Sequence, residues 1–402
     1  LGRADAVEIA VVGAGIGGLA AALALAGAGF APRVLEARDL AGETGAGIQL
    51  SPNGVRVLHA LGLREGLAAI GHRPEAIQLR DSRSGRLIAF RPLGRSSEER
   101  YGAPYYDVHR PALFRLLRDA VTGRGIPLET GARCTGFEEH ADGVRVQLAT
   151  GSLDAALLVG ADGIHSRVRE GLLGADDARF TGNVAYRAVV PAEAVPPSLR
   201  RPVVTAWLGP ARHLVHYPLG DGGDVNVVAV VERDDWREES WTAAATGEEL
   251  ASAFRNWHPA LRELLAAVAT PWKWALHDRP PLPRWSSERV TLLGDACHPM
   301  VPFLAQGACM ALEDAWTLAR LLEDRDEETP AAALDRYQRL RRPRTTRVQR
   351  EARQQGERFH ERARLKRLAR DLELGLGSRL APELAMARYD WLHGHDVVAR
   401  LG

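Results

Sequence analysis

The sequence predicts an α/β fold in which a nucleotide-binding domain carries an inserted, largely antiparallel β-sheet and ends in helices. Three observations lead to this prediction. A glycine-rich turn follows an apolar run near the amino terminus, extended segments separated by Gly and Pro fill residues 183–232, and an Arg-rich helical pattern begins at Pro330. Because the first two patterns differ in periodicity, we expect two closely joined domains.

Composition restricts the class of partner. The 402 residues include 46% hydrophobic and 26% charged side chains, enough to bury a substantial core. The 52 basic and 51 acidic residues leave a formal charge of +1, so no overall field attracts nucleic acid or an anionic membrane. We therefore expect a small-molecule partner, no nucleic-acid or membrane partner, and a monomer or homodimer.

The cysteines indicate the compartment. Cys134, Cys297 and Cys309 are too few and too scattered for a disulfide framework, a zinc site or a redox pair. We expect a cytoplasmic protein without a bound metal.

The first elements predict a βαβ unit. Residues 7–12 suit a parallel strand buried on both faces, residues 16–28 form an Ala- and Leu-rich helix, and residues 32–37 return as a second strand. The charge-free stretch 10–31 resembles a membrane span in composition. Its glycines, however, suit a tight turn between strand and helix, which we expect instead.

The turn itself has the pattern Gly13-x-Gly15-x-x-Gly18. In a nucleotide-binding unit these glycines allow a sharp turn, close backbone approach to a pyrophosphate and close helix-to-strand packing. Glu36 follows near the spacing at which an acidic side chain accepts the ribose hydroxyls of an adenosine. The alternative is a glycine-rich loop with an unrelated surface glutamate.

The later elements alternate between strands and helices. Strands are expected at 76–81, 85–91, 144–148, 155–159, 183–190, 203–208, 213–219, 225–231 and 289–293, and helices at 110–121, 248–267 with a break at 258–259, and 307–322. We expect a nucleotide-binding domain of residues 1–72, 101–178 and 280–345, a sheet domain of residues 73–100 and 179–279, and a C-terminal helical region of residues 346–402. We interpret the Arg-rich run beyond residue 330 as a solvated helix face.

Two further motifs identify a family. They are Gly160-Ala161-Asp162-Gly163-Ile164-His165-Ser166-Arg167-Val168-Arg169, and Gly294-Asp295 followed by Pro299 and Ala305-Gln306-Gly307-Ala308. With the glycine-rich turn, the chain resembles the single-component FAD-dependent aromatic hydroxylases, which include salicylate, 3-hydroxybenzoate and 6-hydroxynicotinate monooxygenases. The resemblance extends to about residue 345 and implies a Rossmann-like FAD-binding domain of the glutathione-reductase type. It also implies tightly but non-covalently bound FAD and NADH or NADPH as a transient electron donor.

The resemblance also assigns residues to the cofactor. Asp295 would accept a hydrogen bond from the ribityl chain, with helix capping as the alternative, and Arg110 would lie near the pyrophosphate or ribityl chain. Gly307 and Ala308 would open a helix whose N–H groups face the flavin pyrimidine oxygen, although the glycine alone suits close packing. The expected cofactor-binding residues are Gly13, Gly15, Gly18, Glu36, Arg38, Gln49, Arg110, Asp162, Gly163, Gly294, Asp295, Gly307 and Ala308.

The implied reaction is hydroxylation of a small electron-rich aromatic compound, of the hydroxybenzoate or hydroxypyridine type, through a flavin C4a-hydroperoxide formed with O2. His213 and Tyr217 lie four residues apart on a predicted strand, so they share a face while His216 points away. Similar hydroxylases carry such a pair beside the substrate, where His213 would act as hydrogen-bond partner and proton relay. The alternative is a His and Tyr satisfied within a sheet core. Pro302 would lie beside the flavin or serve only as a turn residue.

Several features of the substrate stay open. Arg187 and Trp207, on strands predicted to be neighbours, are candidates to contact an acidic aromatic ligand, with surface or core positions as the alternative. Gln49 stands where some pyridine-hydroxylating relatives carry His, which argues against 6-hydroxynicotinate. A hydroxylase or epoxidase of a larger natural product would share every cofactor motif, and so would a non-catalytic FAD-binding protein.

Overall fold

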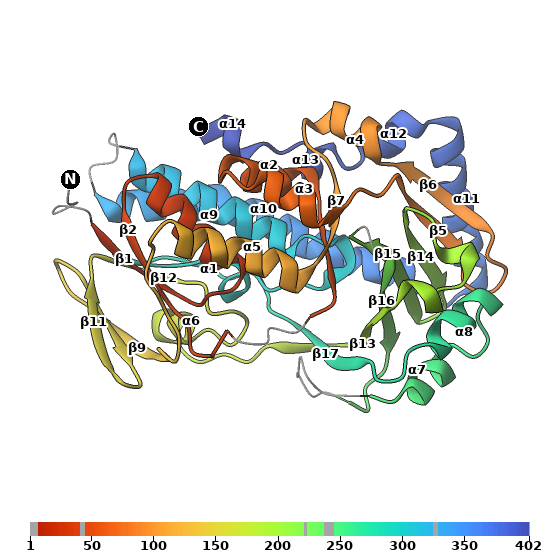
Figure 1. Ribbon diagram of the computed structural model, residues 1–402, viewed down its shortest axis with the longest axis horizontal. Coiled ribbons are helices and arrows are strands. Elements are labelled where there is room, and N and C mark those ends of the chain that lie inside the picture. The colour runs from red at the N-terminus through yellow and green to blue at the C-terminus, as the bar shows by residue number, and fades with distance from the viewer. Residues whose placement is uncertain (1–6, 41–44, 221–222, 237–244, 325–328, 402) are drawn as a thin grey trace.

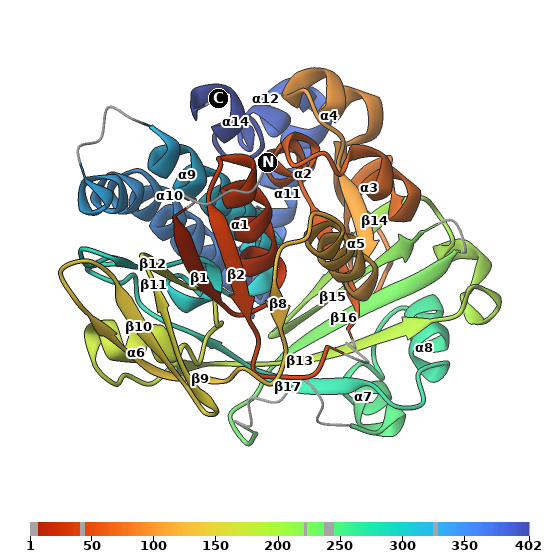
Figure 2. The same ribbon diagram turned by 60° about the vertical axis from the view of Figure 1, so that its left-hand side comes forward.

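The computed structural model describes residues 7–40, 45–220, 223–236, 245–324 and 329–401. A parallel five-stranded sheet forms one lobe, in the order β18-β12-β1-β2-β8 (Figures 1 and 2). Its strands are β1 (Glu8–Val12), β2 (Ala31–Leu35), β8 (Leu128–Glu129), β12 (Leu157–Gly160) and β18 (Val290–Leu292). Strands that are distant in sequence therefore end side by side at one edge of this sheet.

Helices bury the faces of the parallel sheet. The predicted strand-turn-helix at the amino terminus is confirmed, because β1 leads directly into α1 (Ile16–Gly27), whose Ala and Leu side chains are almost all buried. Helix α1 packs between α5 (Arg110–Gly123) and α9 (Gly307–Glu323). Among the described residues, no helix is both long and apolar enough to cross a membrane.

The second lobe is a seven-stranded sheet in the order β17-β13-β16-β15-β14-β5-β6, antiparallel except where β14 pairs with β5. Its strands are β5 (Ala76–Asp81), β6 (Leu87–Pro92), β13 (Arg179–Val190), β14 (Val203–Gly209), β15 (Arg212–Leu219), β16 (Asp224–Glu232) and β17 (Trp272–Asp278). The predicted fold class, a nucleotide-binding α/β domain with a largely antiparallel sheet, is confirmed. One detail is wrong: β16 and β15 separate Arg187 in β13 from Trp207 in β14.

Helices α7 (Gly247–Ala253) and α8 (Pro259–Ala266) cover one face of this second sheet with an apolar cluster. The other strands form two small sheets. One contains β9 (Cys134–Glu139), β10 (Val144–Leu148) and β11 (Gly151–Ala155), and the other contains β3 (Gly47–Leu50), β4 (Gly71–His72) and β7 (Tyr106–His109). The predicted strand 155–159 is wrong as one element, since β11 ends at Ala155 and β12 joins a different sheet. The remaining short helices are α2 (Pro52–Ala60), α3 (Arg64–Ile70), α4 (Gly94–Tyr101) and α6 (Arg167–Leu173), with 3-10 turns at Ala192–Ala194 and Pro197–Leu199.

The C-terminal helices return across both lobes. They are α10 (Pro330–Phe359), α11 (Arg364–Leu380), α12 (Pro382–Ala387), α13 (Asp390–His393) and α14 (Val397–Leu401). Helix α10 packs on α9, and α11 lies beside β6 at the far edge of the second sheet (Figure 1). The expected solvated face is wrong for Arg341, which is only 2% exposed and forms ion pairs with Glu313 and Asp314 of α9.

Candidate functional site

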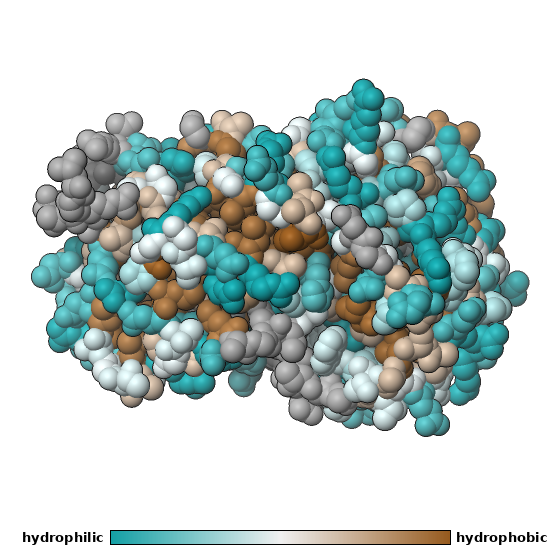
Figure 3. Space-filling view, viewed as in Figure 1, coloured by the Kyte–Doolittle hydropathy of each residue, from teal (hydrophilic) through white to brown (hydrophobic). Residues whose placement is uncertain are grey.

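A cavity of about 1150 Å³ lies between the two lobes. At one end it is bordered by the β1–α1 turn, the end of β12 and the beginning of α9, and at the other by strands β13 to β16. On the face shown in Figure 3, hydrophobic surface gathers near the middle of the molecule. A large, partly apolar cavity at the carboxyl edge of a parallel sheet is the usual ligand site of this architecture.

The glycines of the β1–α1 turn have separate structural roles. Gly13 has φ +104°, and a Cβ there would lie 2.4 Å from the carbonyl oxygen of Ala161. A Cβ on Gly18 would lie 1.9 Å from the carbonyl oxygen of Gly13, so this glycine permits the close helix packing. Gly15 has no such neighbour within 4 Å and borders the cavity, which leaves room for a ligand at the start of α1.

Two acidic side chains order the loops at this end. The buried Glu36 carboxylate accepts hydrogen bonds from the backbone N–H groups of Ala14 (2.8 Å) and Arg38 (2.9 Å), and Glu36 also borders the cavity. Oδ2 of Asp162 accepts hydrogen bonds from the N–H groups of Arg167 (2.7 Å) and Val168 (3.2 Å) at the start of α6. Burial raises the pKa of Asp162.

A second helix begins at the same end of the cavity. Gly294 and Asp295 follow β18 in a 3-10 turn (Gly294–Ala296), with Gly294 at φ +63°. Helix α9 begins at Gly307 without a side-chain cap, and Asp295, Gly307 and Ala308 all border the cavity. The N-termini of α1 and α9 therefore both present backbone N–H groups to one ligand space.

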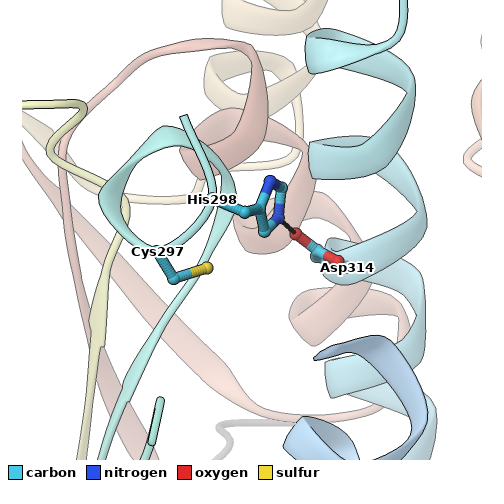
Figure 4. Close-up of side chains that lie close together, drawn as sticks. All are labelled: Cys297, His298 and Asp314. Atoms are coloured by element: carbon cyan, nitrogen blue, oxygen red, sulfur yellow. Dashed lines mark hydrogen bonds and ion pairs between the residues drawn. The ribbon is translucent and has the colours of Figure 1, made fainter. Parts of the chain in front are cut away.

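Figure 4 shows the cluster that anchors this second helix, formed by Cys297, His298 and Asp314. Nε2 of His298 lies 2.5 Å from Oδ2 of Asp314, which also accepts a hydrogen bond from the N–H of Gly294 (3.2 Å). Arg341 donates to the other carboxylate oxygen at 2.7 Å. Burial raises the pKa of the Cys297 thiol well above its ordinary value, so it is protonated and a poor metal ligand. The cluster holds the turn that carries Asp295 against α9.

At the other end of the cavity, β15 contributes a histidine and a tyrosine. His213 and Tyr217 both border the large cavity, whereas His216 and Trp207 border a separate cavity of about 120 Å³. His213 and Tyr217 therefore lie on one face of the strand, as the alternation predicted. The prediction that Trp207 contacts a ligand in the large cavity is wrong. Burial raises the pKa of Tyr217 and lowers that of His213.

Arg187 of β13 places a guanidinium group at this same end. The guanidinium carbon lies 4.4 Å from the centre of the Trp274 ring. Burial lowers the pKa of Arg187 to about 10, so the side chain remains cationic at neutral pH. A cation held beside an aromatic ring in a partly apolar cavity is suited to bind a carboxylate.

Comparisons with known proteins agree with this geometry. Residues 6–352 match the family model described as FAD binding domain. The chain belongs to this family. It is 42% identical over 390 residues to a 3-amino-4-hydroxybenzoate 2-monooxygenase of Streptomyces platensis, a match that covers 97% of this chain and 96% of that protein.

A second relative and a solved structure extend the agreement. The 3-hydroxybenzoate 6-hydroxylase of Polaromonas naphthalenivorans is 38% identical over 394 residues, covering 97% of this chain and 96% of the relative. Klebsiella pneumoniae HpxO, solved with FAD and uric acid, superimposes with a TM-score of 0.84 at 31% identity, covering 96% of this chain and 97% of that one. The protein is thus an FAD-dependent monooxygenase of the aromatic hydroxylase group, as the resemblance implied.

The residues of this monooxygenase fit an extended dinucleotide. All the expected cofactor-binding residues border the cavity except Gly18, which lies behind the turn. The expected catalytic residues His213, Tyr217 and Pro302 border it as well. The uncapped N-termini of α1 and α9 would supply donors for the diphosphate and the ring, and Asp295 and Glu36 would supply acceptors for hydroxyl groups.

Some lining residues were not expected from the sequence. Tyr105 borders the cavity. Behind the lining, the fully buried Asp107 of β7 accepts a hydrogen bond from Nε2 of Gln49 (2.9 Å), and burial raises the pKa of Asp107 well above its ordinary value. The C-terminal helices also border the cavity, through Leu374, Gly377, Ser378, Leu384, Arg388, Tyr389 and His393. No local sequence pattern marks these residues, because only the return of the chain across both lobes brings them there.

Proposed function

We propose that this monooxygenase uses NADH or NADPH and O2 to hydroxylate a small aromatic substrate that carries a carboxylate and a phenolic hydroxyl group. The observation that carries the proposal is the single cavity that joins the dinucleotide-binding edge to Arg187, His213 and Tyr217. The names of the relatives support it, since two of them act on hydroxybenzoates. FAD, when bound, would supply the activation of O2 and the transfer of one oxygen atom.

The residues of the chain would have distinct tasks. Arg187 would bind the carboxylate, His213 and Tyr217 would orient the ring, and His213 would accept the phenolic proton. Apolar side chains would exclude water from the reacting centre, namely Ile77, Val204, Ala206, Val215, Val228, Val230 and Phe303. Pro302 would lie beside the flavin ring, and the domain limits expected from the sequence would divide the cofactor end from the substrate end.

The cysteines bear on where the protein works. Cys134, Cys297 and Cys309 are free and buried, which suits the reducing cytoplasm that we propose for it.

A panel of aromatic acids tests the proposed reaction. The FAD-loaded protein would be mixed with 3-amino-4-hydroxybenzoate, 3-hydroxybenzoate, salicylate or 6-hydroxynicotinate. Consumption of NAD(P)H, release of peroxide and incorporation of ¹⁸O from ¹⁸O2 would be followed. We expect a hydroxybenzoate to be labelled with little peroxide, and 6-hydroxynicotinate to be the weakest because Gln49 stands where some pyridine-hydroxylating relatives carry His. Binding of FAD without a labelled product from any aromatic acid would contradict the proposal and favour a larger substrate or a non-catalytic role.

A further inference from the structure

A chain of hydrogen bonds leads away from the cavity through His213. Nδ1 of His213 lies 2.6 Å from Nε2 of His360, and Nδ1 of His360 lies 3.0 Å from Oε1 of Glu232. The other carboxylate oxygen of Glu232 accepts a hydrogen bond from Arg362 at 2.5 Å. Because Nδ1 of His213 is occupied by His360, its Nε2 is the ring nitrogen left for a ligand in the cavity.

This chain crosses from the interior to the surface. His213 is 3% exposed and His360 4% exposed, whereas the side chain of Glu232 is 30% exposed and that of Arg362 is 70% exposed. His213 borders the cavity and His360 does not. The two imidazoles and the carboxylate thus connect an enclosed space to solvent without an intervening gap.

The backbone fixes the positions of these groups. The N–H of Ala211, in the turn between β14 and β15, donates to the carbonyl of His360 at 3.0 Å. The N–H of Glu232 donates to the carbonyl of Ala211 at 2.9 Å. The rings of Phe303 and Phe359 each lie 5.3 Å from that of His213 in edge-on contact. The second sheet and the end of α10 therefore hold His213 and His360 in place together.

We propose that His360 and Glu232 form, with His213, a relay that carries the phenolic proton of the substrate to solvent. The inference rests on the proposed function and adds two residues to it. As the substrate O–H bond breaks, an N–H bond forms at Nε2 of His213, and the proton on its Nδ1 passes to Nε2 of His360. The proton on Nδ1 of His360 passes to Glu232 and from there to water, so the substrate becomes a phenolate and both imidazoles end neutral.

The surroundings of the relay keep both imidazoles neutral. Burial lowers the pKa of His213 well below its ordinary value and, against the attraction of Glu232, lowers that of His360 to about 4. Arg362 and Arg212 face His360 and act in the same direction as burial. Both imidazoles are therefore neutral near pH 7, so each offers one N–H and one lone pair, as a relay between two rings needs.

Two variants interrupt the relay at different points. His360→Phe keeps an aromatic ring beside Phe303 and Phe359 but removes both nitrogens, and Glu232→Gln keeps a polar side chain that does not take up the proton. His216→Leu is the matched control, since His216 lies on the same strand but faces the small cavity. Stopped-flow absorbance would follow the ionisation of 3-amino-4-hydroxybenzoate after mixing with each FAD-loaded protein.

We expect ionisation to slow by about tenfold or more in His360→Phe and Glu232→Gln, and to be unchanged in His216→Leu. Free imidazole should restore the rate in His360→Ala, an effect that a purely structural role of His360 would not produce. Equal ionisation rates in unaltered protein and His360→Phe would overturn the relay while leaving the proposed function intact. Absence of ionisation and of hydroxylation in the unaltered protein, with every acid of the panel, would instead overturn both proposals.

Discussion

At the scale of single residues, the glycines of the β1–α1 turn divide between packing and ligand binding. Added Cβ atoms at Gly13 and Gly18 would collide with backbone atoms of the chain itself. One at Gly15 would enter open space that borders the cavity. Substitutions at Gly13 and Gly18 are therefore expected to impair folding, whereas a substitution at Gly15 is expected to impair ligand binding.

Gly15→Ala should fold normally but bind FAD at least about tenfold more weakly, because the new methyl group occupies the space where a pyrophosphate approaches the backbone. Fluorescence titration of the apoprotein with FAD measures the affinity, and thermal unfolding without FAD measures stability. Gly27→Ala is the control, since its Cβ also meets nothing within 4 Å but lies at the far end of α1. Unchanged FAD affinity in Gly15→Ala would show that the turn does not approach the diphosphate.

Arg187→Gln should raise KM for a hydroxybenzoate by roughly 10- to 100-fold, because a charged hydrogen bond contributes about 1.5–3 kcal/mol. The effect on kcat should be smaller, since Arg187 would hold the carboxylate equally in the bound substrate and in the transition state. The corresponding phenol without the carboxylate is the control ligand, and its KM should change little. A similar loss for both ligands would mean that Arg187 maintains the shape of the cavity and does not bind the carboxylate.

At the scale of elements, buried ion pairs join α9 to α10. Arg341 donates to Asp314 at 2.7 Å and to Glu313 at 2.6 Å, and Arg344 donates to Glu313 at 2.7 Å. Tyr337 and Leu334 pack nearby in the apolar core. Helix α10 is consequently part of the cofactor lobe, although its sequence has the composition of a surface helix.

Arg341→Met should lower the free energy of unfolding by about 3 kcal/mol or more, because it leaves the charges of Glu313 and Asp314 incompletely paired in the interior. Urea unfolding followed by circular dichroism measures this change. Arg339→Met is a suitable comparison, since Arg339 forms an exposed ion pair with Asp335. Its loss should lower the free energy of unfolding by less than about 1 kcal/mol. Equal costs for the two variants would contradict the structural importance of the buried cluster.

The same cluster predicts a dependence of stability on pH. Burial opposes ionisation of Glu313, yet Arg341 and Arg344 outweigh it and lower its pKa to about 2 from an ordinary value of 4.5. A carboxylate with a lowered pKa stabilises the fold above its ordinary pKa and loses that contribution as the pH falls. The unfolding free energy should therefore fall between about pH 4.5 and pH 2, and the fall should be smaller in Glu313→Gln. Identical pH profiles for the two proteins would contradict this assignment.

The elements that the sequence predicted are those with strong local signals. The β1–α1 turn, α9 and the strands of the second sheet other than β17 (Trp272–Asp278) were predicted because their periodicity and glycines are local properties. The division of residues 151–160 between two sheets was missed, since Ala155 of β11 closely precedes the apolar run of β12 and only strand pairing separates the two strands. The burial of Arg341 was missed because its partners lie in another helix.

At the scale of the whole molecule, the C-terminal helices close the cavity that the two lobes form. Helix α10 delivers His360 to the second sheet, and residues of α11 to α13 border the cavity. The sequence predicted helices here but no role at the site, because a helix of mixed Arg and Leu composition carries no signal for a distant ligand. The candidate site therefore depends on the entire chain and not on the two sheets alone.

This arrangement predicts that a ligand in the cavity protects the C-terminal helices. In the FAD-loaded protein, 3-amino-4-hydroxybenzoate should slow amide hydrogen exchange in α11 (Arg364–Leu380) and α12 (Pro382–Ala387), because their cavity-lining residues would pack on it. The antiparallel strands β10 and β11 serve as the internal control, since they do not border the cavity and should exchange at the same rate with or without the ligand. Hydrogen exchange measured by mass spectrometry distinguishes these segments. Protection confined to β13 to β16 would mean that the substrate binds on the sheet alone and that the C-terminal helices do not close over it.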